Sequence, residues 1–123
     1  MGIPLRIVEK FPVGEREPGM MWRYAEGDED GLECWWIVLP NTKPQGPGYA
    51  SDVSWRTTDR ASKPPHARWN VTGTAPNLTV TPSIDIECWL RQPGVTGTPH
   101  TEHPPVRDGS YWHGFITNGE LVG

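Results

Sequence analysis

The sequence predicts an all-β or mostly β protein: a small sandwich or partly open barrel of short antiparallel strands with long loops rich in Pro and Gly. Among 123 residues there are 14 Gly and 14 Pro, which favour short strands joined by turns over long helices. Residues 79–91 alternate between apolar and polar side chains, as a half-buried strand does. Near the end, Asn-Gly stands between two apolar runs, which is the strongest short-range signal of a β-hairpin.

The length fits one domain with a single core. We expect residues 1–19 to form an extended N-terminal arm, because Pro4, Pro12 and Pro18 interrupt any helix there. Within this arm, LRIV (residues 5–8) is long enough only for an edge strand. Residues 20–123 are then one β-rich domain.

The segment LECWWIVLP (residues 32–40) is apolar on both faces of an expected strand, which indicates a central or interface strand. One face carries Leu32, Cys34, Trp36 and Val38, and the other carries Trp35, Ile37 and Leu39.

Loops are expected over residues 41–52 and 57–67 from their Pro, Gly, Ser and Asp content, with VSW (residues 53–55) as a short edge strand between them. A second strand follows, in which Val80, Ile84, Ile86, Cys88 and Leu90 face inward and Trp89 faces outward, and Pro82 marks an edge, a bulge or a break. Residues 92–109 predict no regular element, because Pro and Gly recur every few residues.

The closing hairpin should pair Thr117 with Glu120 and Ile116 with Leu121, because Asn-Gly suits a two-residue turn that needs positive φ at both positions. This register puts His113 on the face of Phe115 and Val122, so we expect it to pack and to form hydrogen bonds inside the domain rather than to react. The residues assigned a structural role in the hairpin are His113, Gly114, Phe115, Asn118 and Gly119.

The formal net charge is −4, and the stretch from Glu15 to Glu33 holds seven acids against Arg16 and Arg23, so nucleic acid is not expected as a partner. The longest apolar run, CWWIVLP, is too short to span a membrane, and the N-terminus lacks the apolar block of a signal peptide. We therefore expect no membrane association and synthesis without export.

No catalytic motif is found: the sequence has no G-x-S-x-G elbow and no glycine loop that cradles phosphate. Asp85 and Glu87 share a strand face, but on the outward face they are solubilising residues. The sequence therefore predicts neither an enzyme nor a bound cofactor.

A zinc site is the weaker interpretation of the cysteines and histidines, because the pair His100 and His103 in a Pro-rich loop has no fixed geometry and no C-x-x-C is present. Two buried, reduced thiols are the preferred interpretation of the cysteines. The candidate metal ligands are Cys34, Cys88, His100, His103 and His113.

The seven tryptophans are the most distinctive feature. Trp35, Trp89 and Trp112 have sides that one sheet would not cover completely, and exposed tryptophans mark protein interfaces or, less expected here, sugar-stacking platforms. For Trp36 and Trp69, a core crowded with indoles is the alternative.

The C-terminal half resembles a family of small proteins of tailed bacteriophages and bacterial genomes, over about Arg68 to Val122. The matching residues are Trp69, Pro82-Ser83-Ile84, His113-Gly114-Phe115-Ile116 and Asn118-Gly119. Many members also carry an N-terminal cysteine pair and a cysteine directly before the hairpin histidine, which together look like a metal cluster. This chain departs from that pattern, since only Cys34 stands near the early strand and Trp112 precedes His113.

The resemblance implies a phage-encoded protein and no established reaction. We therefore expect a structural or binding protein of the virion, an accessory capsid (decoration) protein or a tail component, that contacts other phage structural proteins or further copies of itself. One alternative is a cytoplasmic accessory protein that binds a host factor or small molecule. The other is a degenerate zinc-binding domain.

Overall fold

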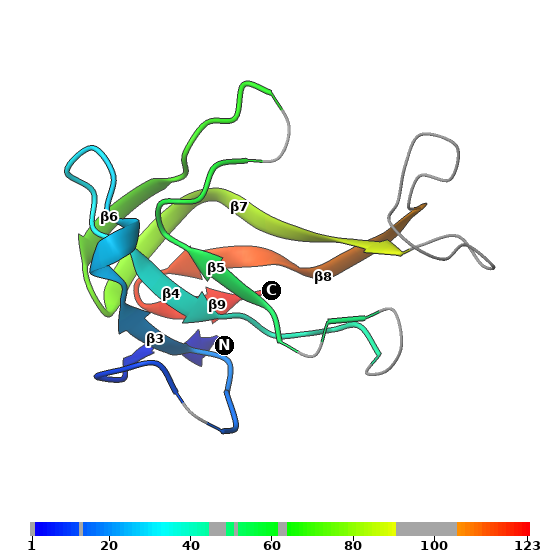
Figure 1. Ribbon diagram of the computed structural model, residues 1–123, viewed down its shortest axis with the longest axis horizontal. Coiled ribbons are helices and arrows are strands. Elements are labelled where there is room, and N and C mark those ends of the chain that lie inside the picture. Colours follow the sequence, from blue (N-terminus) through cyan, green and yellow to red (C-terminus); the bar gives the residue numbers. More distant parts are fainter. Residues whose placement is uncertain (1, 13, 45–48, 51, 62–63, 91–105) are drawn as a thin grey trace.

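A computed structural model describes the chain except for residues 1, 13, 45–48, 51, 62–63 and 91–105. It contains two β-sheets that do not close into a barrel, which confirms the predicted all-β, sandwich-like fold (Figure 1). The described residues include one short 3-10 helix, η1 (Ala25–Gly27), and no helix long and apolar enough to cross a membrane.

The five-stranded sheet has the order β1-β9-β8-β7-β6, and the four-stranded sheet has the order β2-β3-β4-β5. The strands of the first are β1 (Ile3–Pro4), β6 (Asn70–Thr74), β7 (Asn77–Leu90), β8 (Val106–Thr117) and β9 (Glu120–Val122). Those of the second are β2 (Arg6–Ile7), β3 (Met20–Arg23), β4 (Trp35–Val38) and β5 (Ser54–Arg56).

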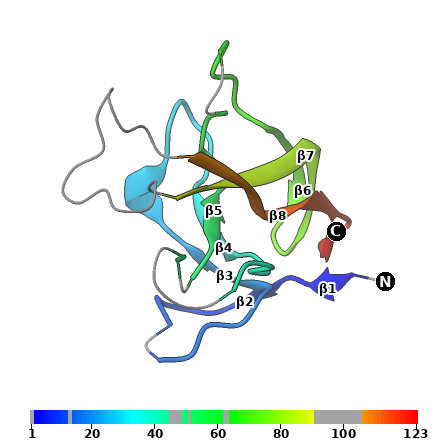
Figure 2. The same cartoon turned by 90° about the vertical axis from the view of Figure 1, so that its right-hand side faces the viewer.

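The N-terminal segment belongs to both sheets. β1 pairs antiparallel with β9, and β2 pairs parallel with β3, so the expectation of antiparallel strands fails for this one pair. The change of sheet takes place at Leu5, whose N–H donates to Gly119 C=O at 2.8 Å, while the Arg6 N–H donates to Gly19 C=O at 2.8 Å. Figure 2 shows β1 and β2 one after the other along the lower part of the view, with the C-terminus near β1.

The core fills the space between the sheets. Full burial of one large apolar side chain contributes about 1.5–3 kcal/mol, so the cluster of buried side chains is the main source of stability. The most deeply buried side chains are Met21, Ile37, Leu39 and Trp55 from the side of the four-stranded sheet and Val80, Ile84, Ile116 and Leu121 from the five-stranded sheet.

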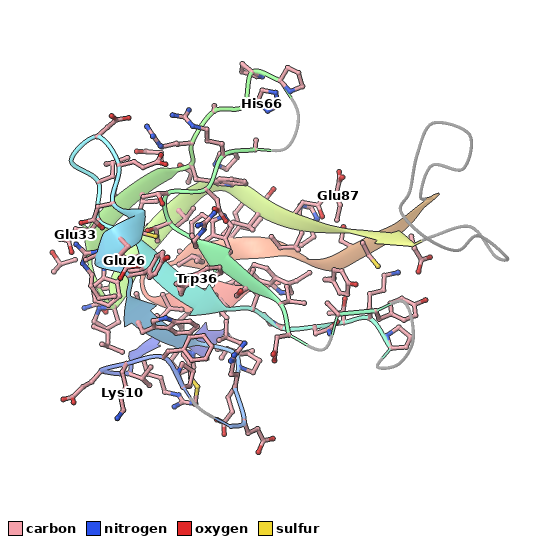
Figure 3. The ribbon with its side chains drawn as sticks, in the orientation of Figure 1. Lys10, Glu26, Glu33, Trp36, His66 and Glu87 are labelled. Carbon is pink, nitrogen blue, oxygen red and sulfur yellow. The ribbon has the colours of Figure 1, made fainter. Side chains whose placement is uncertain are left out.

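β4 is central, as its two apolar faces predict, and β5 is the edge strand expected around VSW. Ile37 faces the core, and Trp36 lies on the outer face, where it stacks on Trp22 with ring centroids 6.1 Å apart. The Arg56 guanidinium carbon lies 5.2 Å from the centroid of the Trp36 ring, which places a cation against this outer aromatic surface. Trp36 is labelled in Figure 3.

β7 follows the predicted alternation and shifts register between Val80 and Ile84, so Pro82 marks an irregularity of the strand. A second hairpin, which was not predicted, precedes it: β6 returns to β7 through Ala75-Pro76, and Thr74 pairs with Asn77.

β8 begins at Val106, so the prediction that residues 92–109 hold no regular element is wrong for its last four residues. Pairing with β7 imposes the strand there, since Val106 lies opposite Leu90. The rest of that predicted loop lies outside the described residues. At the closing turn Asn118 and Gly119 have φ of 46° and 79°, and the pairs Thr117–Glu120 and Ile116–Leu121 match the expected register.

Candidate functional site

A groove of about 530 Å³ lies where β6 of the five-stranded sheet meets the beginning of β4 in the four-stranded sheet. Its apolar surface comes from Trp35, Trp69 and Leu78, and Leu32 stands at its rim with 45% of its surface exposed. This volume is within the range of binding clefts.

The floor of the groove is fixed by hydrogen bonds. The Trp69 indole N–H donates to Ser83 C=O at 3.1 Å, and the Trp35 backbone N–H donates to the Thr57 hydroxyl at 2.9 Å. Thr57 in turn donates its hydroxyl hydrogen to Glu33 C=O at 2.9 Å. The Trp69 indole and the backbone of Trp35 are therefore held in place before any ligand arrives.

Gly73 opens the groove next to Leu78, its partner across the β6–β7 ladder. Its φ is 90°, and a Cβ at this position would come within 2.3 Å of Asn77 C=O. A side chain is therefore excluded at this position of the groove lining.

One wall of the groove is a turn with a high density of carboxylates, residues 28–33, which we call the acidic turn. Arg23 binds the acidic turn from one side. Its Nη1 lies 2.5 Å from Asp28 Oδ1, and its Nε lies 3.1 Å from Glu33 Oε2. Arg68 binds it from the other, at 2.5 Å from Glu29 and 2.9 Å from Asp30.

These contacts leave the acidic turn with four carboxylates and two guanidinium partners. Glu26 adds a further exposed carboxylate on the same side of the molecule (Figure 3). The hydrogen bond from Arg23, followed by that from the Cys34 N–H, lowers the pKa of Asp28 below its ordinary value, so this carboxylate keeps its negative charge in mildly acidic solution.

The three tryptophans proposed as binding residues have different positions. Trp35 is half-buried and lines the groove. Trp112 is only 5% exposed, so its expected exposure is wrong: it pairs with Ile86 on the inner face of the five-stranded sheet. The side chain of Trp89 lies outside the described residues.

The candidate metal ligands lie apart as far as they are described. Cys34 and Cys88 are buried, free thiols, as preferred from the sequence. His113 is exposed, while His100 and His103 lie outside the described residues. Among the residues that the structure covers, no three His, Cys, Asp or Glu side chains form a metal-binding group.

His113 lies on the outer face of the five-stranded sheet, opposite Asp85. Its Nε2 is 3.1 Å from the Ser83 hydroxyl, and the neighbouring Phe115 is 47% exposed. The face that His113 shares with Phe115 is therefore open to solvent, so the prediction that His113 packs inside the domain is wrong, while a hydrogen bond within the domain is present, to the Ser83 hydroxyl.

Sequence reasoning did not identify the groove residues Leu32, Gly73 and Leu78. Gly73 carried a usable signal, since glycine within a strand pattern marks a bulge or the close approach of another backbone. The position of the acidic turn beside β6 depends on the contact between Arg68 and Glu29. These residues are 39 positions apart in the sequence, so no local pattern predicts the contact.

No family model, no curated protein and no solved structure matches this chain.

Proposed function

We propose that this chain is a non-enzymatic protein that acts through protein–protein contacts, with the groove as its docking surface. The carrying observation is the combination of a preformed apolar floor, Trp35 and Trp69, with an edge strand, β6, along one side. Half-buried indoles in a cleft are the kind of anchor around which interface hot spots form.

The polar groups of the groove suit binding better than reaction. The Thr57 hydroxyl both accepts from Trp35 and donates to Glu33, so its hydrogen is already committed. The Glu33 carboxylate is two-thirds exposed and paired with Arg23, which is the setting of a recognition charge rather than of a general base.

As the biological setting we propose the particle of a tailed phage, as an accessory capsid protein or a tail component. This part of the proposal is supported by the sequence resemblance, which includes Trp69 on the groove floor. Proteomics of purified virions from the phage that encodes the chain should detect it, and its absence from intact particles contradicts the virion setting.

The docking surface is tested by site-specific photocrosslinking. A photoreactive phenylalanine at Leu32, on the groove rim, should capture a protein partner. The same group at Phe115 is the matched control, since the two side chains are similarly exposed, at 45% and 47%. Equal capture from both positions, or capture only from Phe115, contradicts the groove as the contact site.

The alternative retained from the sequence is a non-virion protein that binds a host factor or small molecule, and the groove volume of about 530 Å³ is also within the range of small-molecule sites. A crosslinked host protein, with the chain missing from particles, favours this alternative.

A further inference from the structure

We infer that the partner of the groove is an extended, basic segment of another protein, which adds as a further strand along β6 and inserts alternate apolar side chains between the two sheets. The inference rests on the proposed function, because it names the binding mode and the chemistry of the same contact. It depends on three features: the backbone edge of β6, the open inner face beside it and the charge of the acidic turn.

The direction of the backbone groups in β7 fixes which edge groups of β6 are free. The Leu78 N–H donates to Pro76 C=O and its C=O accepts from the Gly119 N–H, both at 2.9 Å, so the polar groups of Leu78 point away from β6. Successive residues of an antiparallel strand direct these groups to opposite sides. Thr79 therefore directs its N–H and C=O toward β6.

Thr72 lies opposite Thr79 in the ladder and is its hydrogen-bonding partner. In β6, the neighbouring residues Val71 and Gly73 must then direct their backbone groups away from β7, toward the open edge of the sheet. These groups are the N–H and C=O of Val71 and the N–H of Gly73. Within the described part of the chain, none of these three groups has a hydrogen-bond partner. Such an unpaired edge is a template for a strand of another chain.

A strand docked on this edge would continue the five-stranded sheet over the groove. Val71 and Val80 face inward together, so docked residues level with Val71 would direct their side chains inward as well, toward Trp35, Trp69 and Leu78. Gly73 leaves that space free of a competing side chain. The partner therefore needs apolar residues at every second position.

The acidic turn favours positive charge at the other positions of the docked segment, between its apolar residues. Glu33 lines the groove, and the turn has more carboxylates than the two guanidinium groups of Arg23 and Arg68 can neutralise. Lysine or arginine on the docked segment would be attracted to it, and acidic side chains would be repelled. A second copy of this chain is disfavoured as the occupant, because its own β6 would bring a second acidic turn to the same contact.

The test uses the full chain and a short synthetic peptide in which valine and lysine alternate. Calorimetry should show saturable binding that weakens as salt is raised, since part of the attraction is between exposed charges. A peptide with glutamate in place of lysine should bind at least about tenfold more weakly. The same lysine peptide with its edge-facing amides N-methylated should lose binding, because it cannot complete the ladder.

The edge itself is tested with Val71→Pro and its matched control Val71→Ala. Both remove the inward isopropyl group, but only proline removes the outward N–H, and an edge strand tolerates proline where the N–H faces solvent. We expect Val71→Pro to bind the lysine peptide about tenfold more weakly than Val71→Ala. Equal affinities of the two variants, or binding of the N-methylated peptide as tight as that of its parent, overturn strand addition.

The two proposals fail in different ways. Crosslinking from Leu32 to a protein partner, together with equal peptide binding by Val71→Pro and Val71→Ala, keeps the docking surface and rejects strand addition. Preference for the glutamate peptide rejects a basic partner. If the chain dimerises through β6, shown by gel filtration of the wild type and its reversal in Val71→Pro, the occupant is a second copy and the inference is wrong.

Discussion

Trp55 and Trp69 meet edge to face, with ring centroids 5.6 Å apart and ring planes at 86°. Trp55 comes from the edge strand of the four-stranded sheet, and Trp69 directly precedes β6 of the five-stranded sheet. The contact therefore joins the two sheets beside the groove.

Two substitutions of Trp69 should lower the free energy of unfolding by different amounts. Trp69→Phe keeps a ring against Trp55 and loses the hydrogen bond to Ser83 C=O, at a cost of about 1 kcal/mol. Trp69→Ala also loses the ring contact and its buried surface, for about 2–3 kcal/mol in total. Urea denaturation measures both, with Phe115→Ala as an exposed control that should change stability by less than about 1 kcal/mol. A Trp69→Ala variant as stable as the wild type contradicts the structural role of this contact.

The closing turn should depend on Gly119. Its φ is 79°, and a Cβ there would come within 3.0 Å of Pro76 C=O, so Gly119→Ala should cost about 1–2 kcal/mol of unfolding free energy. Asn118→Gly is the matched control, because glycine adopts the positive φ of that position without strain, and it should change stability by less than about 0.5 kcal/mol. Thermal unfolding of the two variants tests this, and equal losses would show that backbone conformation is not the cause.

Stability should decrease in acid through Asp28. Arg23 and the Cys34 N–H lower the pKa of this carboxyl, so its contribution is complete above the ordinary pKa of about 3.9 and is lost as the pH falls through the lower folded-state value. In Asp28→Asn the amide oxygen still accepts from Cys34 but does not titrate. Chemical denaturation across this pH range should therefore show the difference between wild type and variant shrinking toward low pH. A difference that is constant with pH contradicts the assignment.

The two thiols should be inert in the folded protein. Cys34 and Cys88 are both 0% exposed, so labelling with a disulfide reagent requires opening of the structure. We expect slow reaction under native conditions and rapid reaction of both thiols in denaturant. Rapid labelling of the native chain would contradict the burial of these side chains.

Local chemistry explains which parts of the fold were predictable. The Asn118-Gly119 turn follows from the positive φ that its geometry needs, and the inward side of β7 follows from its alternation. Trp112 was placed wrongly because a strand with apolar residues on both faces does not reveal which face the rest of the chain covers. The start of β8 was missed because Asp108 and Gly109 have low strand propensity, and pairing with β7 overrides it.

The groove was not predictable, because it forms where three distant stretches meet. Trp35 and Trp69 are recognisable as aromatic residues, but which of their sides remains open depends on the acidic turn, and that turn is held by Arg68. The unpaired groups of β6 depend on strand order, since only the final topology decides which strand is at an edge. The charges, the tryptophans and the glycine were visible in the sequence, and their assembly was not.

Leu5 connects the two sheets through the backbone at the edges opposite β5 and β6. The strand before it pairs in one sheet and the strand after it pairs in the other, so the backbone passes between the sheets within one residue. On the other side the sheets are joined through the loop from residue 57 to 69, which is much longer. The two sheets are therefore joined by continuous backbone at Leu5, whereas beside β6 they are joined by side chains, through the Trp55–Trp69 contact and the ion pairs of Arg68 with the acidic turn.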